Sequence, residues 1–341
     1  MRAKPLPALY SLAHLWVDLS CALLLFGPLS GAPSFALYLL LYNFCAFALQ
    51  MPLGLAADRL SRGGGLAAAG CCLTALAYCS PLPLMAPLTA GMGNALFHLG
   101  GGMDVLRAGG ERGAALGVFV SPGALGLYLG ALWARGGSAL LWTAPAGLLV
   151  LAGAIWLLRR SAAPSRAGGR RPLPAGGYGV VLPLFLVVVL RSYLGMNQSF
   201  AWRGQGRWAL WLTLALALGK AAGGFAMDRL GPRRASAVSL VLAGGLYLAS
   251  ALPLPGTLAV FLFNMTMPMT LWAVARVLPE GFAFGLLTFG LFLGFLPSYL
   301  GWPSLLAGPA SYAAGALVSL LLLAPPLAAL GRGREARRVR C

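Results

Sequence analysis

The chain has 341 residues, of which 59% are hydrophobic and only 9% are charged, and its mean hydropathy is +0.82. Water-soluble domains carry about 25% charged residues, so this composition excludes a soluble globular protein. The net charge of +18 would indicate nucleic-acid binding in a soluble chain. In a membrane protein, basic residues instead follow the topology, and no nucleic-acid partner is predicted.

Apolar runs of about 20 residues recur from end to end, which is the length of a membrane-spanning helix. They do not alternate polar and apolar residues, so a β-barrel is excluded and an all-α membrane protein is predicted. A basic Pro/Gly-rich linker at 159–177 separates two predicted domains, 1–158 and 178–341. The twelve predicted spans are 8–30, 34–57, 64–80, 82–105, 113–134, 138–158, 178–200, 208–227, 235–253, 256–278, 281–300 and 308–330.

The first predicted span contains two ionisable residues, His14 and Asp18, in the stretch SLAHLWVDLSCALLLF. The basic N-terminus before it is similar to a secretory signal. Because Asp18 interrupts the apolar stretch and further spans follow, we predict a helix that stays in the mature protein. At about 1.5 Å per residue, Asp18 lies about 15 Å into the span, near the midplane, and His14 lies one turn nearer the cytoplasm on the same face.

The distribution of basic residues predicts the orientation. With the N-terminus in the cytoplasm, 20 of the 25 basic residues fall on the cytoplasmic side. Three lie in outer loops (Arg135, Arg203 and Arg207), and Arg191 and Lys220 lie inside spans. This excess is a positive-inside signal, so both termini are predicted to be cytoplasmic, in the cytoplasmic membrane of a cell. The basic C-terminal tail is interpreted as a topology determinant that touches anionic lipid.

The two halves of the chain repeat with an offset of 170 residues. The stretch GLAADRL, which begins at Gly54, aligns with GFAMDRL, which begins at Gly224. Gln50 aligns with Lys220, and Asn94 aligns with Asn264. Duplicated six-helix halves are typical of transporters whose substrate site lies at the repeat interface near the midplane.

GLAADRLSR and GKAAGGFAMDRLGPRR resemble the G-x-x-x-D-R-x-G-R-R loop motif of the major facilitator superfamily, which follows the second and eighth helices. The resemblance implies twelve transmembrane helices in two pseudo-symmetric six-helix bundles, with the first, fourth, seventh and tenth helices lining a central cavity. It implies secondary transport by alternating access. The motif residues, with an implied gating role, are Gly54, Asp58, Arg59, Gly224, Asp228 and Arg229.

A finer similarity is to drug exporters of the fosmidomycin-resistance type. It is carried by GMGNALFHLGGGMDVLR, ERGAALGVFVSPGALG, VLRSYLGM and the His-x-x-x-Asp pattern of the first span. The stretch from Gly117 to Gly123 is similar to a motif associated with antiporters. This resemblance implies drug or metabolite efflux by proton antiport.

Further polar residues lie deep in other predicted spans. Asn94 lies near the middle of the fourth span, and His98 lies about 24 Å from its outer end. Arg191 lies about 20 Å into the seventh span. Charged residues inside a bilayer are costly and are usually functional. The alternatives are a structural ion pair between Asp18 and Arg191, packing roles for the histidines, amides that hold helices together, and a Lys220 that reaches the interface.

These residues predict a proton-coupled transporter of a small anionic or amphipathic compound. Burial would raise the pKa of Asp18, and a nearby Arg191 would lower it. Histidines, which titrate near neutral pH, would relay the proton. The proton-coupling residues are predicted to be Asp18, His14, His98 and Arg191. The predicted substrate-binding residues are Asn94, Arg191, Asn264, Lys220, Asn43 and Asn197.

Other classes of function are less well supported by the sequence. An uptake carrier and a transport-inactive membrane sensor or assembly protein are the open alternatives. The chain has no HExxH, GxSxG or phosphate-loop motif, so no enzyme is predicted. The six cysteines show no ligand spacing, so no metal and no cofactor is expected beyond the proton gradient. The predicted partners are a small-molecule substrate, protons and the lipid bilayer, with the chain as a monomer.

Overall fold

The computed structural model describes residues 5–60, 63–137, 141–160, 177–302, 304 and 306–338. Every regular element within these ranges is a helix, and they contain no β-strand, which confirms the all-α prediction for the described part of the chain. Most of the predicted basic linker, at 161–176, lies outside the described residues, as do Ser61 and Arg62 of the first loop motif and the last residues of the basic tail.

The chain forms two compact units. Unit 1 comprises residues 1–110, 118–168 and 280–289, and unit 2 comprises residues 111–117, 169–279 and 290–341. Each unit therefore includes one short segment from the other half of the sequence. Two helices, α6 (Ala114–Val120) and α14 (Glu280–Tyr299), have residues in both units. The predicted division into domains 1–158 and 178–341 stays a prediction.

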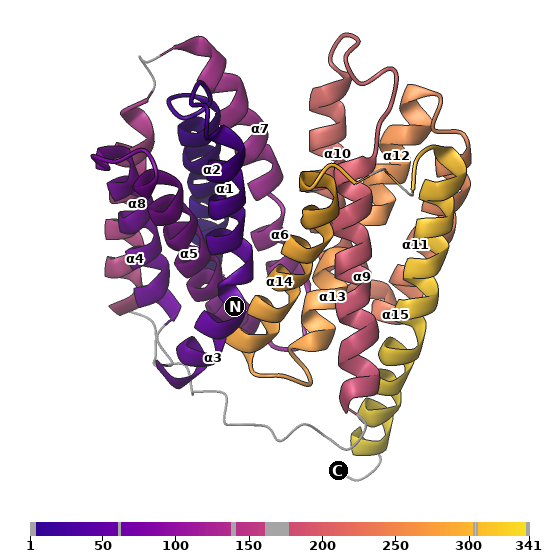
Figure 1. Cartoon of the computed structure of the whole chain (residues 1–341). Coiled ribbons are helices and arrows are strands. Elements are labelled where there is room, and N and C mark those ends of the chain that lie inside the picture. The colour runs from indigo at the N-terminus through magenta and orange to yellow at the C-terminus, as the bar shows by residue number, and fades with distance from the viewer. Residues whose placement is uncertain are drawn as a thin grey trace. The chain divides into compact units, whose positions relative to one another are not determined.

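Unit 1 is built around α1, which packs against α5, α7 and α8 (Figure 1). The neighbouring helix α4 packs against α5 and α8. Together these helices enclose the polar residues of the first and fourth predicted spans. The helices of unit 1 are α1 (Pro5–Phe26), α2 (Phe35–Asn43), a π-helix (Phe44–Ala48), α3 (Gln50–Leu60), α4 (Gly63–Leu76), α5 (Met85–Gly109), α7 (Gly123–Trp133) and α8 (Thr143–Arg160).

In unit 2, α11 packs against α10, α12 and α15, while α9 packs against α13 and α15. The helix pair α12 and α13 is one apolar stretch that is interrupted at Met265. Pro268 lies just after this break, and proline removes the hydrogen bond to the residue four positions earlier, Asn264. The helices of unit 2 are α9 (Gly177–Asn197), α10 (Trp208–Leu230), α11 (Pro232–Leu248), α12 (Pro253–Asn264), α13 (Thr266–Val274) and α15 (Pro309–Arg338).

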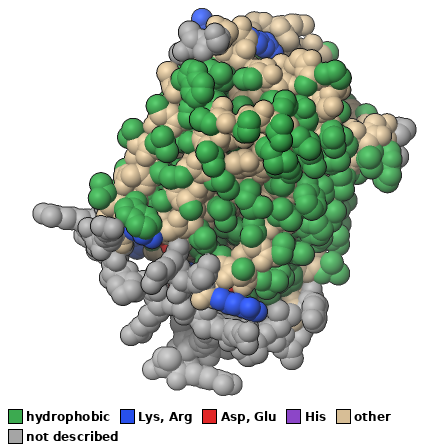
Figure 2. All heavy atoms as spheres, turned by 60° about the vertical axis from the view of Figure 1, so that its left-hand side comes forward, with side chains coloured by type: hydrophobic (Ala, Val, Ile, Leu, Met, Phe, Trp, Pro, Cys, Tyr) green, Lys and Arg blue, Asp and Glu red, His purple; other side chains and the backbone are tan. Residues whose placement is uncertain are grey.

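The outward-facing side chains are apolar. Trp142, Val150 and Leu157 of unit 1 are 60%, 72% and 64% exposed, and Figure 2 shows hydrophobic side chains across most of the visible face, with Lys and Arg near its ends. Eight described helical stretches are long and apolar enough to cross a bilayer, and two shorter apolar helices occur at Gly63–Cys79 and Thr143–Arg159. Apolar surface of this extent is expected to contact lipid rather than water.

Glycines allow close approach between helices within unit 1. A Cβ atom at Gly93 of α5 would collide with Thr74 and with the carbonyl of Gly70, both on α4. Small residues at such contacts let two helix backbones pack directly together, which is a main source of helix association in a bilayer. By contrast, a Cβ at Gly153 of α8 would meet open space.

We expect Gly93→Ala to destabilise the protein by about 1–3 kcal/mol, because the added methyl group overpacks the contact between α4 and α5. Gly153→Ala is the matched control and should leave stability unchanged or raise it, since alanine favours a helix by about 1 kcal/mol over glycine. Thermal unfolding of the detergent-solubilised protein measures both. An equal effect of the two substitutions would show that the contact is not close-packed.

Candidate functional site

The structure brings four of the predicted polar residues together inside unit 1. His14 and Asp18 come from α1, and Asn94 and His98 come from α5. All four are buried, with 6%, 8%, 1% and 8% of their surfaces exposed, in that order. On each helix the two residues are four positions apart, so they lie on one face and point toward the same place.

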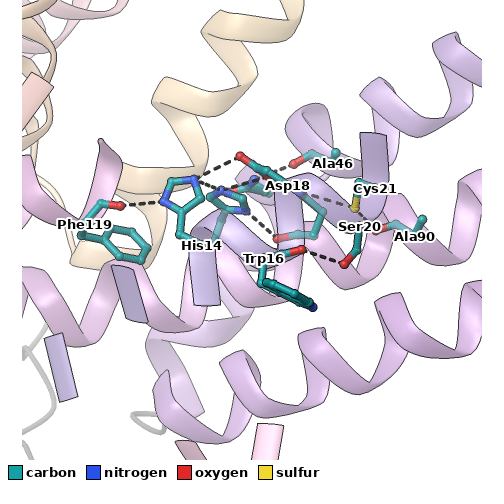
Figure 3. A network of polar contacts seen from close by, with 11 residues as sticks. His14, Trp16, Asp18, Ser20, Cys21, Ala46, Ala90 and Phe119 are labelled. Carbon is teal, nitrogen blue, oxygen red and sulfur yellow. Dashed lines mark hydrogen bonds and ion pairs between the residues drawn. The ribbon is translucent and has the colours of Figure 1, made fainter. Parts of the chain in front are cut away.

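The two imidazole rings meet directly. His14 Nε2 lies 2.8 Å from His98 Nε2. The Asp18 carboxylate lies beside this contact, 3.3 Å from His14 Nε2 and 3.9 Å from His98 Nε2. Asn94 donates a hydrogen bond of 2.9 Å from Nδ2 to Asp18 Oδ1. Figure 3 shows His14 between Asp18 and the carbonyl group of Phe119.

Backbone carbonyls fix the tautomer of each ring. His14 Nδ1 lies 2.6 Å from the Phe119 carbonyl oxygen, and His98 Nδ1 lies 2.9 Å from the Asn94 carbonyl oxygen. A carbonyl only accepts, so each Nδ1 must carry the hydrogen and donate. In the neutral form of both rings, each Nε2 would then present a lone pair to the other. Two lone pairs do not attract at 2.8 Å, so we infer that one proton is shared between the Nε2 atoms.

The shared proton makes the cluster electrically balanced. One imidazolium and one carboxylate sum to zero net charge, which suits a site that is shielded from water. Asn94 completes the group by donating to Asp18, while its own Oδ1 is buried without a hydrogen-bond partner. The cluster consists of residues His14, Asp18, Asn94 and His98 and is called the histidine-pair site below.

The three ionisable residues of this site also have the donor atoms of a metal site, since His14, Asp18 and His98 can converge on one ion. At a zinc–nitrogen distance of about 2.0–2.1 Å, two nitrogens of a tetrahedral ion lie about 3.3 Å apart. The observed Nε2–Nε2 separation of 2.8 Å is shorter and matches a hydrogen bond. The geometry therefore fits a shared proton better than a bound metal ion.

A glycine on α7 makes room for the histidine-pair site. A Cβ atom at Gly123 would collide with His14 Nε2 and with Asp18 Oδ2. Gly126 and Gly130 follow on the same face of α7 and let it approach the backbone of α1 at Leu15 and Leu19. The sequence showed Gly123 only as part of a motif-like stretch, and its role in the site depends on packing that sequence spacing does not reveal.

The remaining cationic site residue, Arg191 on α9, lies in unit 2. It is 8% exposed and donates hydrogen bonds from Nη2 to the hydroxyl oxygens of Thr266 and Thr270, at 2.9 and 3.2 Å. Its predicted partner Asp18 lies in unit 1, so the pairing of Asp18 with Arg191 stays a prediction. The two threonines were not among the sequence-based candidates.

The other predicted substrate-binding residues lie on four different helices. Asn43 donates to the Leu39 carbonyl and Asn264 to the Val260 carbonyl, each within its own helix. Lys220 is half-buried on α10 of unit 2. Asn197 donates to the Tyr193 carbonyl and, at 2.8 Å, to Ser298 Oγ on α14. Their predicted roles in substrate binding stay predictions.

The aspartates of the two loop motifs cap helices. Asp58 accepts hydrogen bonds of 2.8 Å from the backbone N–H groups of Gly281 and Phe282, at the start of α14. In unit 2, Asp228 accepts from the N–H groups of Gly113 and Ala114, at the start of α6. A carboxylate is favourable there, because the first N–H groups of a helix lack partners and carry partial positive charge.

Each cap joins a motif from one half of the sequence to a helix start from the other half. Gly54 supports the first cap by close approach to Gly281, and Gly224 supports the second by close approach to Gly113. Arg59 and Arg229 are exposed. Two ion pairs repeat the same pattern: Arg107 with Glu280 at 3.9 Å, and Arg276 with Glu111.

A third aspartate, Asp104 on α5, was missed by the sequence analysis. It accepts a hydrogen bond of 2.7 Å from Tyr10 Oη on α1. A Cβ at Gly63, the first residue of α4, would collide with this carboxylate. Asp104 therefore lies at the start of α4 and ties it to α1 and α5.

No sequence-family model matches the chain, and no curated protein sequence does. Solved structures do match over almost its whole length. The chain is similar to the E. coli fucose:proton symporter FucP, with a TM-score of 0.66, 14% identity, and coverage of 95% of this chain and 97% of that one. The chain has the major facilitator fold.

Two further similarities agree with the major facilitator fold. The human organic anion transporter TETRAN matches with a TM-score of 0.63 and 18% identity, over 95% of this chain and all of that one (100%). The proton:xylose symporter XylE matches with a TM-score of 0.64 and 13% identity, over 93% and 94% of the two chains. These neighbours are transporters rather than enzymes. At such low identity, the similarity shows the fold alone.

The shared proton can be tested directly, because the chain has only two histidines. In protein made with isotope-labelled histidine, nitrogen NMR should show both Nδ1 atoms protonated and a coupling between the two Nε2 atoms across the shared hydrogen. His98→Asn should abolish that coupling. Two neutral rings, either of them with its only hydrogen on Nε2, would contradict the assignment.

Proposed function

We propose that the chain is a proton-coupled secondary active transporter that works by alternating access and exports a small anionic or amphipathic compound. The major facilitator fold supports membrane transport. The observation that carries the coupling proposal is the pair of Nε2 atoms, 2.8 Å apart, that lie beside the Asp18 carboxylate. The proton gradient is the energy source, and no further cofactor is required.

The proposal links the proton to the shape of unit 1. An ionisable group inside a bilayer is costly and is functional by default. With the proton bound, the imidazolium and Asp18 compensate each other. With the proton lost and the tautomers unchanged, two lone pairs would face each other and the carboxylate would be uncompensated. Proton release therefore needs a rearrangement, and a site that binds protons differently in two conformations couples them to transport.

The Phe119 carbonyl is the element whose movement would release the proton. It holds the hydrogen on His14 Nδ1. If the carbonyl moved away, His14 could give up the Nδ1 hydrogen and keep the one on Nε2, which would still donate to the His98 Nε2 lone pair. One proton leaves, and the contact between the rings survives. The net charge of the site changes from zero to −1.

The helix that carries Phe119 is suited to transmit motion. Residues 114–117 of α6 belong to unit 2, whereas residues 118–120 belong to unit 1. The helix stops at Ser121 and Pro122, before α7 begins. A movement of unit 2 relative to unit 1 would therefore pull on α6 and on the carbonyl that sets the tautomer of His14. Asp58 and Asp228 are the proposed gating residues in this scheme, because each caps a helix, α14 or α6, that has residues in both units.

The proposed topology has twelve spans with both termini in the cytoplasm. The ten apolar helical stretches described above supply ten of them, and α5 and α11, with 25 and 17 residues, supply the other two. The excess of basic residues on one side supports the proposed cytoplasmic position of both ends in the cytoplasmic membrane. The proposed transporter is a monomer.

A second candidate is an uptake carrier for a small metabolite. Two structural neighbours are proton symporters. A symporter and an antiporter can use the same proton site, because they differ in whether proton binding favours or opposes solute binding. A transport-inactive sensor or assembly protein with the same fold is the third candidate, and it should move neither solute nor protons.

The coupling role of Asp18 can be measured in proteoliposomes that contain a pH dye. Butyrate, propylphosphonate and fucose are added in turn to the full chain, and we expect at least one to drive proton flux in wild type. Asp18→Asn should abolish that flux but retain exchange of labelled for unlabelled solute, because exchange needs no net proton movement. The direction of the flux separates export from uptake.

Ser30→Ala, in an exposed turn after α1, is the control and should match wild type. Proton flux at the wild-type rate in Asp18→Asn would show that the histidine-pair site does not couple transport. A wild-type chain that moves no protons with any of the three solutes would contradict the proposed function.

A further inference from the structure

Arg191 is a buried cation that has no acidic partner among the described residues of its own unit, unit 2. It lies about 21 Å from the start of α9, well inside the proposed bilayer core. Only 8% of its surface is exposed, and its Nε is buried without a hydrogen-bond partner. Within the described residues, its Nη2 donates two hydrogen bonds, which end on the neutral hydroxyls of Thr266 and Thr270.

Every acidic side chain that the structure describes is engaged elsewhere. The sequence has seven acidic residues, and the side chain of Glu335 is not among those described. Asp18 belongs to the histidine-pair site. The others cap helices or pair with other arginines: Asp58, Asp104 and Asp228 lie at helix starts, and Glu111 and Glu280 form ion pairs.

The threonine hydroxyls orient Arg191 without neutralising it. Thr266 donates its own hydrogen to the Phe263 carbonyl, and Thr270 donates to the Thr266 carbonyl. Each hydroxyl oxygen is therefore turned toward the guanidinium as an acceptor, and the two together fix the position of its Nη2. The remaining guanidinium donors still carry the positive charge, which is costly in this environment unless an anion meets it.

We propose that Arg191, positioned by Thr266 and Thr270, binds the oxyanion group of the solute that the protein transports. The ligand class is a small molecule with a carboxylate, phosphonate or sulfonate group, because planar guanidinium donors match such oxygens in pairs. The assignment rests on the proposed function for its claim that the ligand is transported. The binding itself rests on the unpaired buried charge.

The break between α12 and α13 supports this placement. Thr266 is the first residue of α13, directly after the interruption at Met265, and Thr270 follows one turn later. Irregular backbone at membrane depth is tolerated where it lines a cavity or a binding site. Asn264, the last residue of α12, lies within two residues of Thr266, so the pair of helices concentrates polar side chains at this depth.

The test uses the full chain in detergent, with no gradient, and measures its Tm. Butyrate, propylphosphonate and propylsulfonate are the anionic probes, and butylammonium and butyramide are controls of similar size at constant ionic strength. A ligand that binds only the folded state raises Tm. We expect at least one anion to raise Tm and neither control to do so.

Variants identify the site. Arg191→Gln should weaken the binding of that anion by about tenfold or more, because a charged donor group is lost. Thr270→Val keeps the shape of the side chain but removes the hydroxyl that orients Arg191, so binding should weaken by a smaller factor. Arg203→Gln, which removes an exposed arginine of the same unit, is the matched control and should bind as wild type does.

The Tm without ligand separates binding from a structural role. Arg191→Gln should leave that Tm unchanged or raise it, because it removes an uncompensated buried charge. A marked fall in Tm, an unchanged anion affinity in Arg191→Gln, or a wild-type chain that none of the three anions stabilises would each overturn the proposal.

Failure of the coupling proposal has a different signature. Asp18→Asn should bind the anion with an intact Arg191, even where it moves no protons. If wild type binds the anion through Arg191 but moves no protons, only the proposed function is contradicted. If wild type couples protons to transport but Arg191→Gln binds the anion as tightly as wild type does, only this inference is contradicted.

Discussion

The contact between His14 Nε2 and His98 Nε2 organises the rest of unit 1. The carbonyls of Phe119 and Asn94 hold each ring with its Nε2 lone pair toward the other ring, so we infer that a proton lies between them in this conformation. Asp18 then supplies the compensating charge, and Gly123 supplies the space. The low dielectric of the surroundings makes each of these parts necessary, because an unpaired charge or an unpaired polar group is costly there.

The same constraint explains where the few other charges are found. A chain with seven acidic residues in 341 has little negative charge to place. Asp58 and Asp228 lie at helix starts, where partial positive charge is available, and Glu280 and Glu111 pair with arginines. Arg191 departs from this pattern, since its described partners are neutral hydroxyls. A buried cation whose described partners are neutral is a candidate for binding an anion from outside.

The sequence was sufficient for the coarse architecture and for part of the site. Helix rise and apolar run length are nearly constant in a bilayer, so counting residues placed His14 level with His98 and Asp18 near Asn94, and the structure brings these four together. Residue counting could not predict which ring nitrogens of His14 and His98 donate hydrogen bonds. The tautomers depend on carbonyls from α5 and α6, and Gly123 matters only because α7 packs on α1 at that point.

Other elements could not be predicted because hydropathy does not report them. The interruption of α12 and α13 at Met265 and the exchange of residues 111–117 and 280–289 between the units are set by tertiary packing. Thr266 and Thr270 gave no signal in the sequence, since threonines are common in membrane helices and only their contact with Arg191 distinguishes them. The pairing of Asp18 with Arg191 was argued from depth and from the resemblance that implies a shared cavity for the first and seventh helices, and it stays a prediction.

The central claim is that a proton held in unit 1 is linked to a solute bound in unit 2. Such linkage is reciprocal, so solute affinity must depend on pH if the two sites are coupled. The direct measurement is the Kd of the stabilising anion as a function of pH in wild type and in His98→Asn. We predict that log Kd changes by about one per pH unit over part of the range in wild type and is flat there in His98→Asn. The same slope in both proteins would contradict the claim.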